Sequence, residues 1–308
     1  MRKSVIITLT AVALLAGTLA EARPGGRLKD RLGQRGAQSE QAAMPDAKGK
    51  QTLQYGPDKL QELDFYPAAT GNRRAPLVIF VHGGGWKRGS KDNATGPWKA
   101  PHYTGLGYAY ASINYRLVPD ATVEQQGADV AGSVRYLIDN AARLGFDPLR
   151  IVIMGHSAGA HLVALVGTDE SYLKSVGLSF AALDGVVPID GAAYDVARQM
   201  SDGGKLMSDT YIGAFGTDPA RHRALSPTLH AASPNAPAFL IIHVQRQDGT
   251  AQSIGLQVAL RKGGTPADRQ QFDGRGLTGH MEINRQLGNP AYAATPVVDA
   301  WLKRVFGA

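Results

Sequence analysis

The pattern of apolar and polar positions changes at about residue 53, where apolar runs and helical stretches begin to alternate. Short continuous apolar runs rich in β-branched residues are typical of buried strands. They predict strands at residues 77–81, 108–113, 151–154, 183–189 and 239–244. Apolar residues at helical spacing predict helices at 123–144 and 158–166, and a last helix that begins at 289–290 and runs to about 305. This alternation predicts an α/β domain, a mainly parallel sheet with helices on both faces.

One stretch interrupts that alternation. Residues 198–233 are long, polar and punctuated by Gly and Pro, and they lie between two predicted core strands. An insertion at this point suits a flap over a substrate, but it is equally typical of a surface excursion. Both interpretations stay open, and residues 53–308 are taken as one domain.

The first residues read as an export signal. Arg2 and Lys3 provide a positive start, residues 5–20 form an uncharged and mostly apolar run, and residues 20–22 offer a small-x-small cleavage site. The run is shorter than the ~20 residues that a membrane-spanning helix needs. We therefore expect a signal peptide at 1–22 and a secreted or periplasmic protein, with an uncleaved anchor as the alternative. The chain has no cysteine, which excludes disulfides and a lipoprotein anchor.

The net charge of +7 belongs mostly to the first residues. Residues 1–50 hold nine basic and four acidic residues, so the remaining 258 carry a net charge of only +2. Residues 23–52 are basic and nearly free of large apolar side chains, which predicts a disordered linker. The folded part has no basic stripe with interleaved aromatic residues, so nucleic-acid binding is not expected.

A nucleophile is predicted at Ser157. The sequence Gly155-His156-Ser157-Ala158-Gly159 lies directly between a predicted strand and a predicted helix. A serine on so tight a turn projects its hydroxyl clear of the backbone, and bulkier residues in place of the glycines would collide with the neighbouring strand and helix. This is the form of a nucleophile elbow.

Donors for an oxyanion are predicted just after the strand at 77–81. The loop reads His82-Gly83-Gly84-Gly85-Trp86. Glycines let bare backbone N–H groups approach a carbonyl oxygen, so Gly83 and Gly84, with the N–H of Ala158, are the expected oxyanion hole. A phosphate-binding loop is excluded because it needs Lys and then Ser or Thr after its last glycine, whereas Gly89 is followed by Ser and then Lys.

The general base should follow the last strand, and His280 occupies such a position. The residue that orients it should follow the preceding strand, where Asp248 lies, which gives the order Ser, Asp, His. Asp190 and Asp195, after the strand before that, are the alternatives. His156, inside the elbow, is expected to point away from the site. No metal-ligand spacing is present and the predicted hydrolysis needs no cofactor.

Taken together, these blocks resemble the α/β-hydrolase serine esterases of the hormone-sensitive-lipase-like and bacterial feruloyl/acetyl-esterase type. The resemblance runs from about residue 53 to the C-terminus. It implies the α/β-hydrolase fold and a serine carboxylesterase. In such relatives the acid is followed two residues on by a Val-Pro-like pair, which Asp248 lacks. The remaining shared blocks are Ile113-Asn114-Tyr115-Arg116-Leu117, Asp129 with 134–137, 147–151, and Gly279-His280-Met281-Glu282-Ile283-Asn284.

The expected activity is hydrolysis of small or aryl acyl esters by an exported enzyme through an acyl-enzyme intermediate. An acylated polysaccharide is a further candidate substrate, and no stable membrane insertion is expected. Two alternatives remain: an arylformamidase-like amidohydrolase with the same triad, and a catalytically inactive α/β-hydrolase that serves as a binding module. Arg116 and Asp129 are interpreted as structural, holding a loop to a helix.

Overall fold

The computed structural model describes residues 47–202 and 204–307, of which 204–206 are described by their backbone alone. The predicted signal peptide at 1–22 and most of the predicted linker at 23–52 lie outside the described residues. The first described strand, β1 (Gln51–Gln54), begins two residues before the predicted domain boundary. No helix in the described part of the chain is both long and apolar enough to cross a bilayer.

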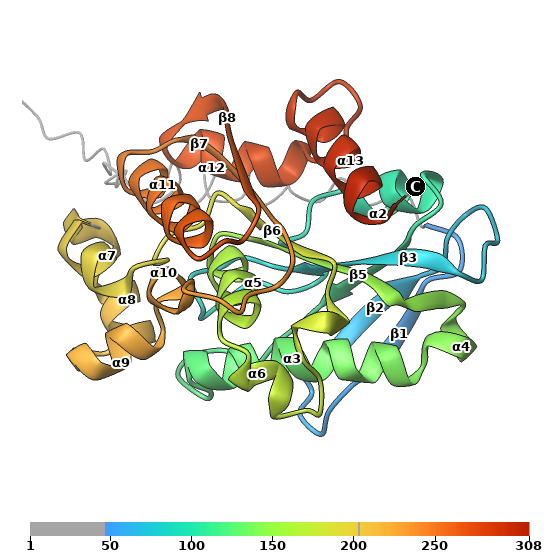
Figure 1. Ribbon diagram of the computed structural model, residues 1–308, viewed down its shortest axis with the longest axis horizontal. Helices are drawn as coiled ribbons and strands as arrows, with labels where there is room; N and C mark the ends of the chain where they lie inside the picture. Colours follow the sequence, from blue (N-terminus) through green and yellow to red (C-terminus); the bar gives the residue numbers. More distant parts are fainter. Residues whose placement is uncertain (1–46, 203, 308) are drawn as a thin grey trace, which may run out of the picture. The chain divides into compact units, whose positions relative to one another are not determined.

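In the part of the chain that the structure describes, eight strands form one sheet in the order β1-β2-β4-β3-β5-β6-β7-β8 (Figure 1). Strand β2 pairs antiparallel with β1 and with β4, and the other neighbours are parallel. The carboxyl ends of the parallel strands therefore meet at one edge of the sheet, which is where open α/β sheets bind ligands. The strands after β1 are β2 (Glu62–Tyr66), β3 (Ala75–Val81), β4 (Ala109–Ile113), β5 (Phe146–His156), β6 (Gly185–Ile189), β7 (Phe239–Gln245) and β8 (Ala267–Arg275).

Helices cover both faces of the sheet (Figure 1), as the strand–helix alternation predicts. In β3, Leu77 and Ile79 join one apolar cluster, whereas Val78 and Phe80 join the other. The first cluster is covered by α3 (Val123–Asp139), α4 (Ala141–Leu144), α5 (Ala158–Thr168), α6 (Ser171–Lys174), η1 (Phe180–Ala182) and α11 (Gln247–Lys262). The second is covered by α2 (Lys99–Gly105), α12 (Gly276–Gln286) and α13 (Ala294–Val305).

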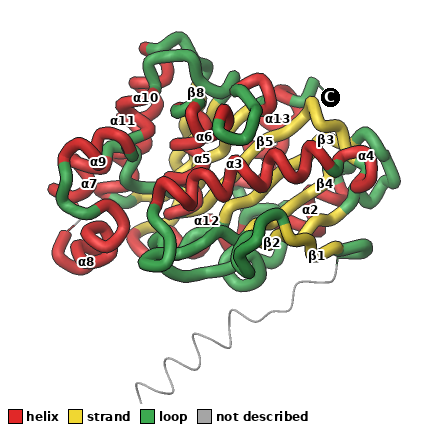
Figure 2. Tube along the Cα trace, turned by 90° about the horizontal axis from the view of Figure 1, so that it is seen from below, coloured by secondary structure: helices red, strands yellow, loops and turns green. Residues whose placement is uncertain are grey.

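The segment predicted as a flap or excursion at 198–233 is helical. It contains α7 (Val196–Asp202), α8 (Gly204–Phe215), α9 (Pro219–Ala224) and α10 (Pro227–His230), and α7, α8 and α9 lie together at one end of the sheet (Figures 1 and 2). Phe215 of α8 is buried, and its ring packs edge-on against the Trp86 indole at a centroid distance of 4.8 Å. The segment is thus packed on the loop that follows β3.

The five strands predicted from apolar runs are present, whereas β1, β2, β8 and α2 have no counterpart in the prediction and two predicted helices have other bounds. The helix predicted at 123–144 is interrupted at Asn140, where α3 ends and α4 begins. The last helix begins at Ala294, because Asn289 closes a turn in which its carbonyl accepts the N–H of Tyr292. Strand β8 is largely polar and lies at the edge of the sheet, so no apolar run marks it.

Candidate active site

Ser157 lies between the end of β5 and the start of α5, at the edge where the parallel strands end. Its backbone has φ 57° and ψ −116°, and its N–H donates to the carbonyl of Ile189 at 3.0 Å. A non-glycine residue in the left-handed region is strained, and such strain is held only where surrounding structure enforces it. This is the backbone geometry of the predicted elbow.

The two glycines of the motif are required by close packing. A Cβ atom at Gly155 would lie 2.3 Å from the carbonyl oxygen of Gly159, and one at Gly159 would lie 2.2 Å from the carbonyl oxygen of Val81. Both contacts are with backbone, which cannot move aside as a flexible side chain can. The glycines therefore let β5, α5 and β3 approach closely enough to form the turn, as the sequence predicts.

The glycine loop after β3 lies beside the nucleophile. A Cβ atom at Gly83 would be 3.0 Å from the Cβ of Ser157, and Gly84 has φ 131° with space for no side chain because the Arg88 carbonyl is in the way. Within the described part of the chain, the N–H groups of Gly83 and Gly84 donate to no acceptor. Ala158 is the first residue of α5, where an N–H has no intrahelical acceptor. These three donors are where the oxyanion hole was predicted.

Contacts from β4 and its following loop fix the glycine loop in place. The ring of His82 stacks on that of Tyr115 at 4.3 Å, and the Tyr115 hydroxyl donates to the His82 carbonyl at 3.0 Å. The Nδ1 of His82 lies 2.7 Å from the Gly83 carbonyl. Burial lowers the pKa of His82 to about 4, so its ring is neutral near pH 7 and Nδ1–H is the donor.

The other end of the loop is tied to the helical insertion. Trp86 Nε1 donates to Nδ1 of His161 at 3.3 Å, and Nε2 of His161 donates to the Leu225 carbonyl at 2.8 Å. Burial lowers the pKa of His161 to about 4, which keeps this ring neutral and able to accept at one nitrogen and donate at the other. His161 therefore connects α5, the oxyanion loop and the end of α9.

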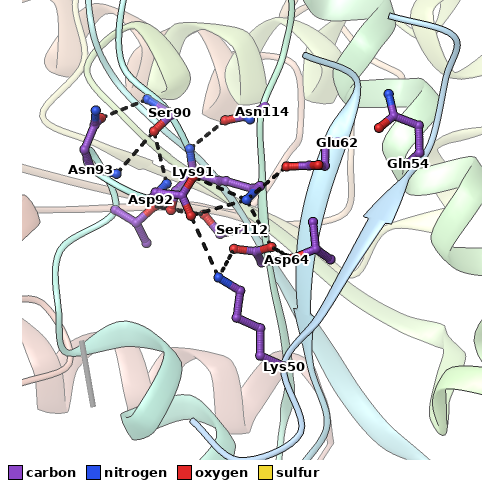
Figure 3. Close-up of polar contacts among 12 residues, drawn as sticks. Lys50, Gln54, Glu62, Asp64, Ser90, Lys91, Asp92, Asn93, Ser112 and Asn114 are labelled. Carbon is purple, nitrogen blue, oxygen red and sulfur yellow. Dashed lines mark hydrogen bonds and ion pairs between the residues drawn. The ribbon is translucent and has the colours of Figure 1, made fainter. Parts of the chain in front are cut away.

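A network of ion pairs anchors the segment after the oxyanion loop to the antiparallel edge of the sheet (Figure 3). Lys91 Nζ lies 3.1 Å from Glu62 and 3.1 Å from Asp64, and Lys50 Nζ lies 2.7 Å from Asp64. The side chains of Lys91 and Asp64 are only 5% and 2% exposed. The backbone N–H of Lys91 donates to the side chain of Asn114 at 2.7 Å. One end of the loop is thus held to β2 and β4.

Arg116 and Asp129 have the structural role inferred from the sequence. Two guanidinium nitrogens of Arg116 contact the buried carboxylate of Asp129, at 2.7 Å for Nη2 and 2.9 Å for Nε. The same carboxylate accepts the backbone N–H of Arg116 at 2.9 Å. This paired contact joins the loop after β4 to α3.

His280 is oriented by Asp190, not by the predicted Asp248. His280 Nδ1 lies 2.6 Å from Asp190 Oδ2, and Asp190 directly follows β6. This result corrects the predicted pairing and selects one of the two alternatives left open. His280 itself lies on α12, after β8, as its place near the C-terminus suggests. A neutral imidazole that donates from Nδ1 keeps a lone pair on Nε2.

The Asp190 carboxylate is fully buried and held from several sides. Its Oδ1 accepts the backbone N–H of Val244 at 3.1 Å, and its Oδ2 lies 2.9 Å from Arg246 Nε. Burial by itself would raise the pKa of the Asp190 carboxyl. The hydrogen bond from His280 and the charge of Arg246 outweigh burial and hold this pKa below its usual value. Asp190 is therefore a carboxylate near neutral pH.

Asp248 does not contact His280, because of the path of the chain after β7. The chain turns into α11 at Gln247, directly after β7, so Asp248 sits in the first helical turn instead of a loop. Its Oδ2 accepts from Gln199 Nε2 at 3.1 Å. Asp195, the other alternative, accepts the backbone N–H of Arg198 at 3.1 Å and so lies at the start of α7.

His156 does not point away from the site as expected. Its ring packs on the ring of His280 at a centroid distance of 4.4 Å, and its Nε2 donates to the His280 carbonyl at 2.9 Å. Burial, with the nearby His280 second, holds the pKa of His156 well below its usual value. The neutral His156 thus links the elbow to α12. The one sequence signal for this location of His156 is its place in the elbow, directly before Ser157.

A buried lysine holds the same helix from the other side. Lys99 Nζ donates to the Thr95 carbonyl at 2.6 Å and to the side-chain oxygen of Asn284 at 2.9 Å, and it also contacts the Asn284 carbonyl. Asn284 is one helical turn beyond His280 on α12. The sequence gives no signal for this contact, which joins residues 185 positions apart. Among the described residues, no group of three His, Cys, Asp or Glu could hold a metal ion.

The sequence is similar to a known protein family and to named esterases. The BD-FAE family model matches residues 63–257. Esterase LipQ of Mycobacterium tuberculosis is 30% identical over 224 residues, which are 69% of this chain and 52% of that protein. The isoprenylcysteine alpha-carbonyl methylesterase ICME of Arabidopsis thaliana is 31% identical over 132 residues, 43% of this chain and 30% of the relative. The chain thus spans about half or less of the length of these relatives.

The fold is similar to that of solved esterases. Esterase B from Lactobacillus Rhamnosis superposes with a TM-score of 0.71 at 22% identity, covering 91% of this chain and 92% of that one. A truncated carbohydrate esterase from gut microbiota gives a TM-score of 0.71 at 22% identity, covering 86% and 99%. These structures identify the fold as that of the α/β-hydrolases.

Proposed function

The chain belongs to the BD-FAE family, and from its site we propose that it is a serine carboxylesterase that cleaves small or aryl acyl esters through an acyl-enzyme intermediate. The observation that carries the proposal is the 2.6 Å contact between His280 Nδ1 and the buried Asp190 carboxylate. His280 lies on α12, and its ring packs on His156, the residue before Ser157 in the elbow. Named esterases among its relatives support the same reaction class.

In the first half of the proposed reaction, His280 Nε2 takes the proton of the Ser157 hydroxyl as its oxygen attacks the ester carbonyl. Asp190 keeps the imidazole in the tautomer with Nδ1 protonated and stabilises the positive charge that it gains. The oxygen of the tetrahedral intermediate accepts N–H groups from Gly83, Gly84 and Ala158. One such donor is worth about 2.7–4 kcal/mol in the transition state.

The second half releases the acyl group. Collapse of the intermediate passes the proton from His280 to the leaving alcohol and leaves the acyl group on Ser157. Water then attacks that ester, with His280 again taking a proton, and the carboxylic acid departs. As the second tetrahedral intermediate collapses, His280 passes that proton to the Ser157 oxygen. The original serine proton has left with the alcohol and a proton from water replaces it, so the enzyme is regenerated without a cofactor.

The proposal is tested by Ser157→Ala. We expect the kcat for p-nitrophenyl acetate to fall on the order of a million-fold, because only binding and the oxyanion donors remain. The exposed Ser175, whose hydroxyl caps the end of α6, provides the matched control Ser175→Ala, which should keep full activity. Labelling of the wild type by a fluorophosphonate at Ser157 is the second readout. An unchanged rate in Ser157→Ala would refute Ser157 as the nucleophile, and an unlabelled wild type would favour the inactive binding module.

The substrate class requires its own measurement. The same three groups could cleave an N-formyl aryl amide, so rates on N-formyl aryl amides and aryl acetates should be compared. We expect the ester to be hydrolysed faster. Feruloyl esters and acetylated xylan belong in the panel because an acylated polysaccharide is a candidate substrate. Faster turnover of the formamide would assign the chain to amide chemistry.

Export remains part of the proposal. The positive start and the apolar run at 5–20 support cleavage after residue 20 or 22. We expect the mature protein recovered from outside the cytoplasm to begin within a few residues of that site. Recovery of the full-length chain from the membrane fraction would instead favour the uncleaved anchor.

A further inference from the structure

Arg246 occupies the place at which the sequence predicts an acid. It follows β7, the strand next to β6, and its backbone leads directly into α11. In this position the chain carries a positive side chain that is only 17% exposed. The carboxylate that contacts His280 comes instead from Asp190, one strand away.

The guanidinium of Arg246 surrounds Asp190. Its Nε lies 2.9 Å from Asp190 Oδ2, the same oxygen that contacts His280. Its Nη2 donates to the backbone carbonyls of Asp190 at 3.1 Å and Gly191 at 3.2 Å. These contacts hold both the carboxylate and the backbone that presents it, at a residue whose φ is 45°.

Two neighbours shape the position of the guanidinium. A Cβ atom at Gly249 would lie 2.6 Å from Arg246 Nη2, so the absence of a side chain there leaves space for the guanidinium. Asp248 Oδ1 lies 3.8 Å from Arg246 Nη1, on the more exposed side. Asp248, the residue predicted as the triad acid, is therefore a partner of Arg246.

From these contacts we infer that Arg246 is a positioning residue that fixes Asp190 and sets the pH range in which His280 can act as a base. The inference rests on the proposed function. Asp190 and a neutral His280 together carry one buried negative charge, and Arg246 balances it. A fixed positive charge beside the pair opposes the gain of a second positive charge by the imidazole.

Other titratable and charged groups lie near Asp190 and His280, but none of them contacts the Asp190 carboxylate as Arg246 does. Among the described residues, only His280 and Arg246 form ion pairs with Asp190. Lys99 lies near His156, but it donates to Thr95 and Asn284, and burial holds the pKa of its ammonium group well below the usual value. The other titratable groups near the pair or near Arg246 are His156 of β5, Tyr194 after β6, His243 of β7, Asp248 of α11 and Tyr292 after α12. Asp273 of β8 and Glu282 of α12 lie near Tyr292.

The experiment is the pH profile of kcat/KM for p-nitrophenyl acetate between pH 4.5 and 9. A histidine base loses activity on protonation, so the wild type should have an acidic limb. In Arg246→Met we expect this limb to move up by about one pH unit, because the opposing charge is gone. The plateau kcat should fall about tenfold through the looser Asp190, with KM unchanged within about twofold.

Further variants test whether the charge of Arg246, and not only the packing of its side chain, shifts the acidic limb. Arg246→Lys should return the acidic limb to within about 0.3 pH units of the wild type, because it keeps the charge. Asp248→Asn should move the limb down by about 0.3 units, because Arg246 loses its partial neutralisation. Arg304→Met, which removes a surface arginine paired with Asp268, should leave the profile unchanged.

The outcomes are distinguishable. A folded Arg246→Met with the wild-type limb would overturn the inference and leave the esterase proposal intact. If Arg246→Met fails to fold, the downward shift in Asp248→Asn decides, and no shift there overturns the inference. A wild type with no acidic limb and full activity in Ser157→Ala would instead overturn the proposed function.

Discussion

His280 and Asp190 are in contact at 2.6 Å although 90 positions separate them in the chain. The contact exists because β6 ends beside β5, which carries the elbow, and because α12 packs against the second apolar cluster on the sheet. The acid thus comes from the strand adjacent to that of the nucleophile. The prediction from chain order placed it one strand further away.

The first prediction separates the two aspartates. Asp190→Asn should lower kcat by on the order of 10³–10⁴, because the amide can stabilise the wrong tautomer and cannot stabilise an imidazolium. The matched change Asp248→Asn should keep kcat near pH 8 within about threefold, because its carboxylate contacts Gln199 and lies near Arg246, not His280. Steady-state kinetics on p-nitrophenyl acetate measure both. The reverse order of effects would restore Asp248 as the acid.

The elbow and the oxyanion loop could be read from the sequence because local geometry demands particular residues. Gly155 and Gly159 have no room for a side chain, and the strand and helix around Ser157 are strongly patterned. The acid could not be read in the same way. Any aspartate at the end of a neighbouring strand satisfies the chain order, and only the three-dimensional path after β7 decides between Asp190 and Asp248.

Strand β8 and the contacts of Lys99 could not be predicted from the sequence for a related reason. Strand β8 carries mostly polar residues at the sheet edge, and an edge strand has one neighbour and little need for a continuous apolar run. Lys99 is fully buried, and among residues 47–202 and 204–307 it has no carboxylate partner; no sequence pattern predicts this. Such contacts depend on which loops meet in space.

The second prediction concerns the glycines of the elbow. Gly155→Ala should abolish soluble expression or lower the free energy of unfolding by more than about 3 kcal/mol, because its Cβ would meet the Gly159 carbonyl at 2.3 Å. Gly132→Ala on α3 is the matched control, since a Cβ there meets nothing within 4 Å. That variant should be neutral or more stable by up to about 1 kcal/mol. Urea unfolding of both proteins provides the comparison, and equal stabilities would contradict the packing argument.

The third prediction concerns the ion pairs in Figure 3. Asp64→Ala should lower the free energy of unfolding by about 3–5 kcal/mol, because it leaves the buried Lys91 without its nearest buried partner. Lys50→Met removes a cation that is 37% exposed, and should cost no more than about 1 kcal/mol. Chemical denaturation measures both changes. If the free energy of unfolding fell equally in the two variants, the buried Asp64–Lys91 pair would contribute no more to stability than the exposed Lys50 does.

The fourth prediction follows from the neutral buried histidines. Burial lowers the pKa of His82 and of His161 to about 4 and holds that of His156 well below its usual value. Below pH 6.5 the unfolded chain therefore binds protons that the folded chain does not. Stability is present in full above pH 6.5 and is lost as the pH falls toward 4, by up to about 3 kcal/mol for each of His82 and His161.

Thermal unfolding at a series of pH values measures that loss. His161→Gln keeps an amide donor and acceptor near Trp86 and Leu225 and cannot be protonated, so its melting temperature should depend less on pH between 6.5 and 4 than that of the wild type. His230→Gln changes a partly exposed histidine at the end of α10 and should retain the wild-type slope. Because Asp190 has a lowered pKa, its own contribution is lost only at still lower pH, below about 4. If the stability of the wild type were constant from pH 7 to 4.5, the buried histidine rings would accept protons without a cost in free energy. That result would contradict the prediction.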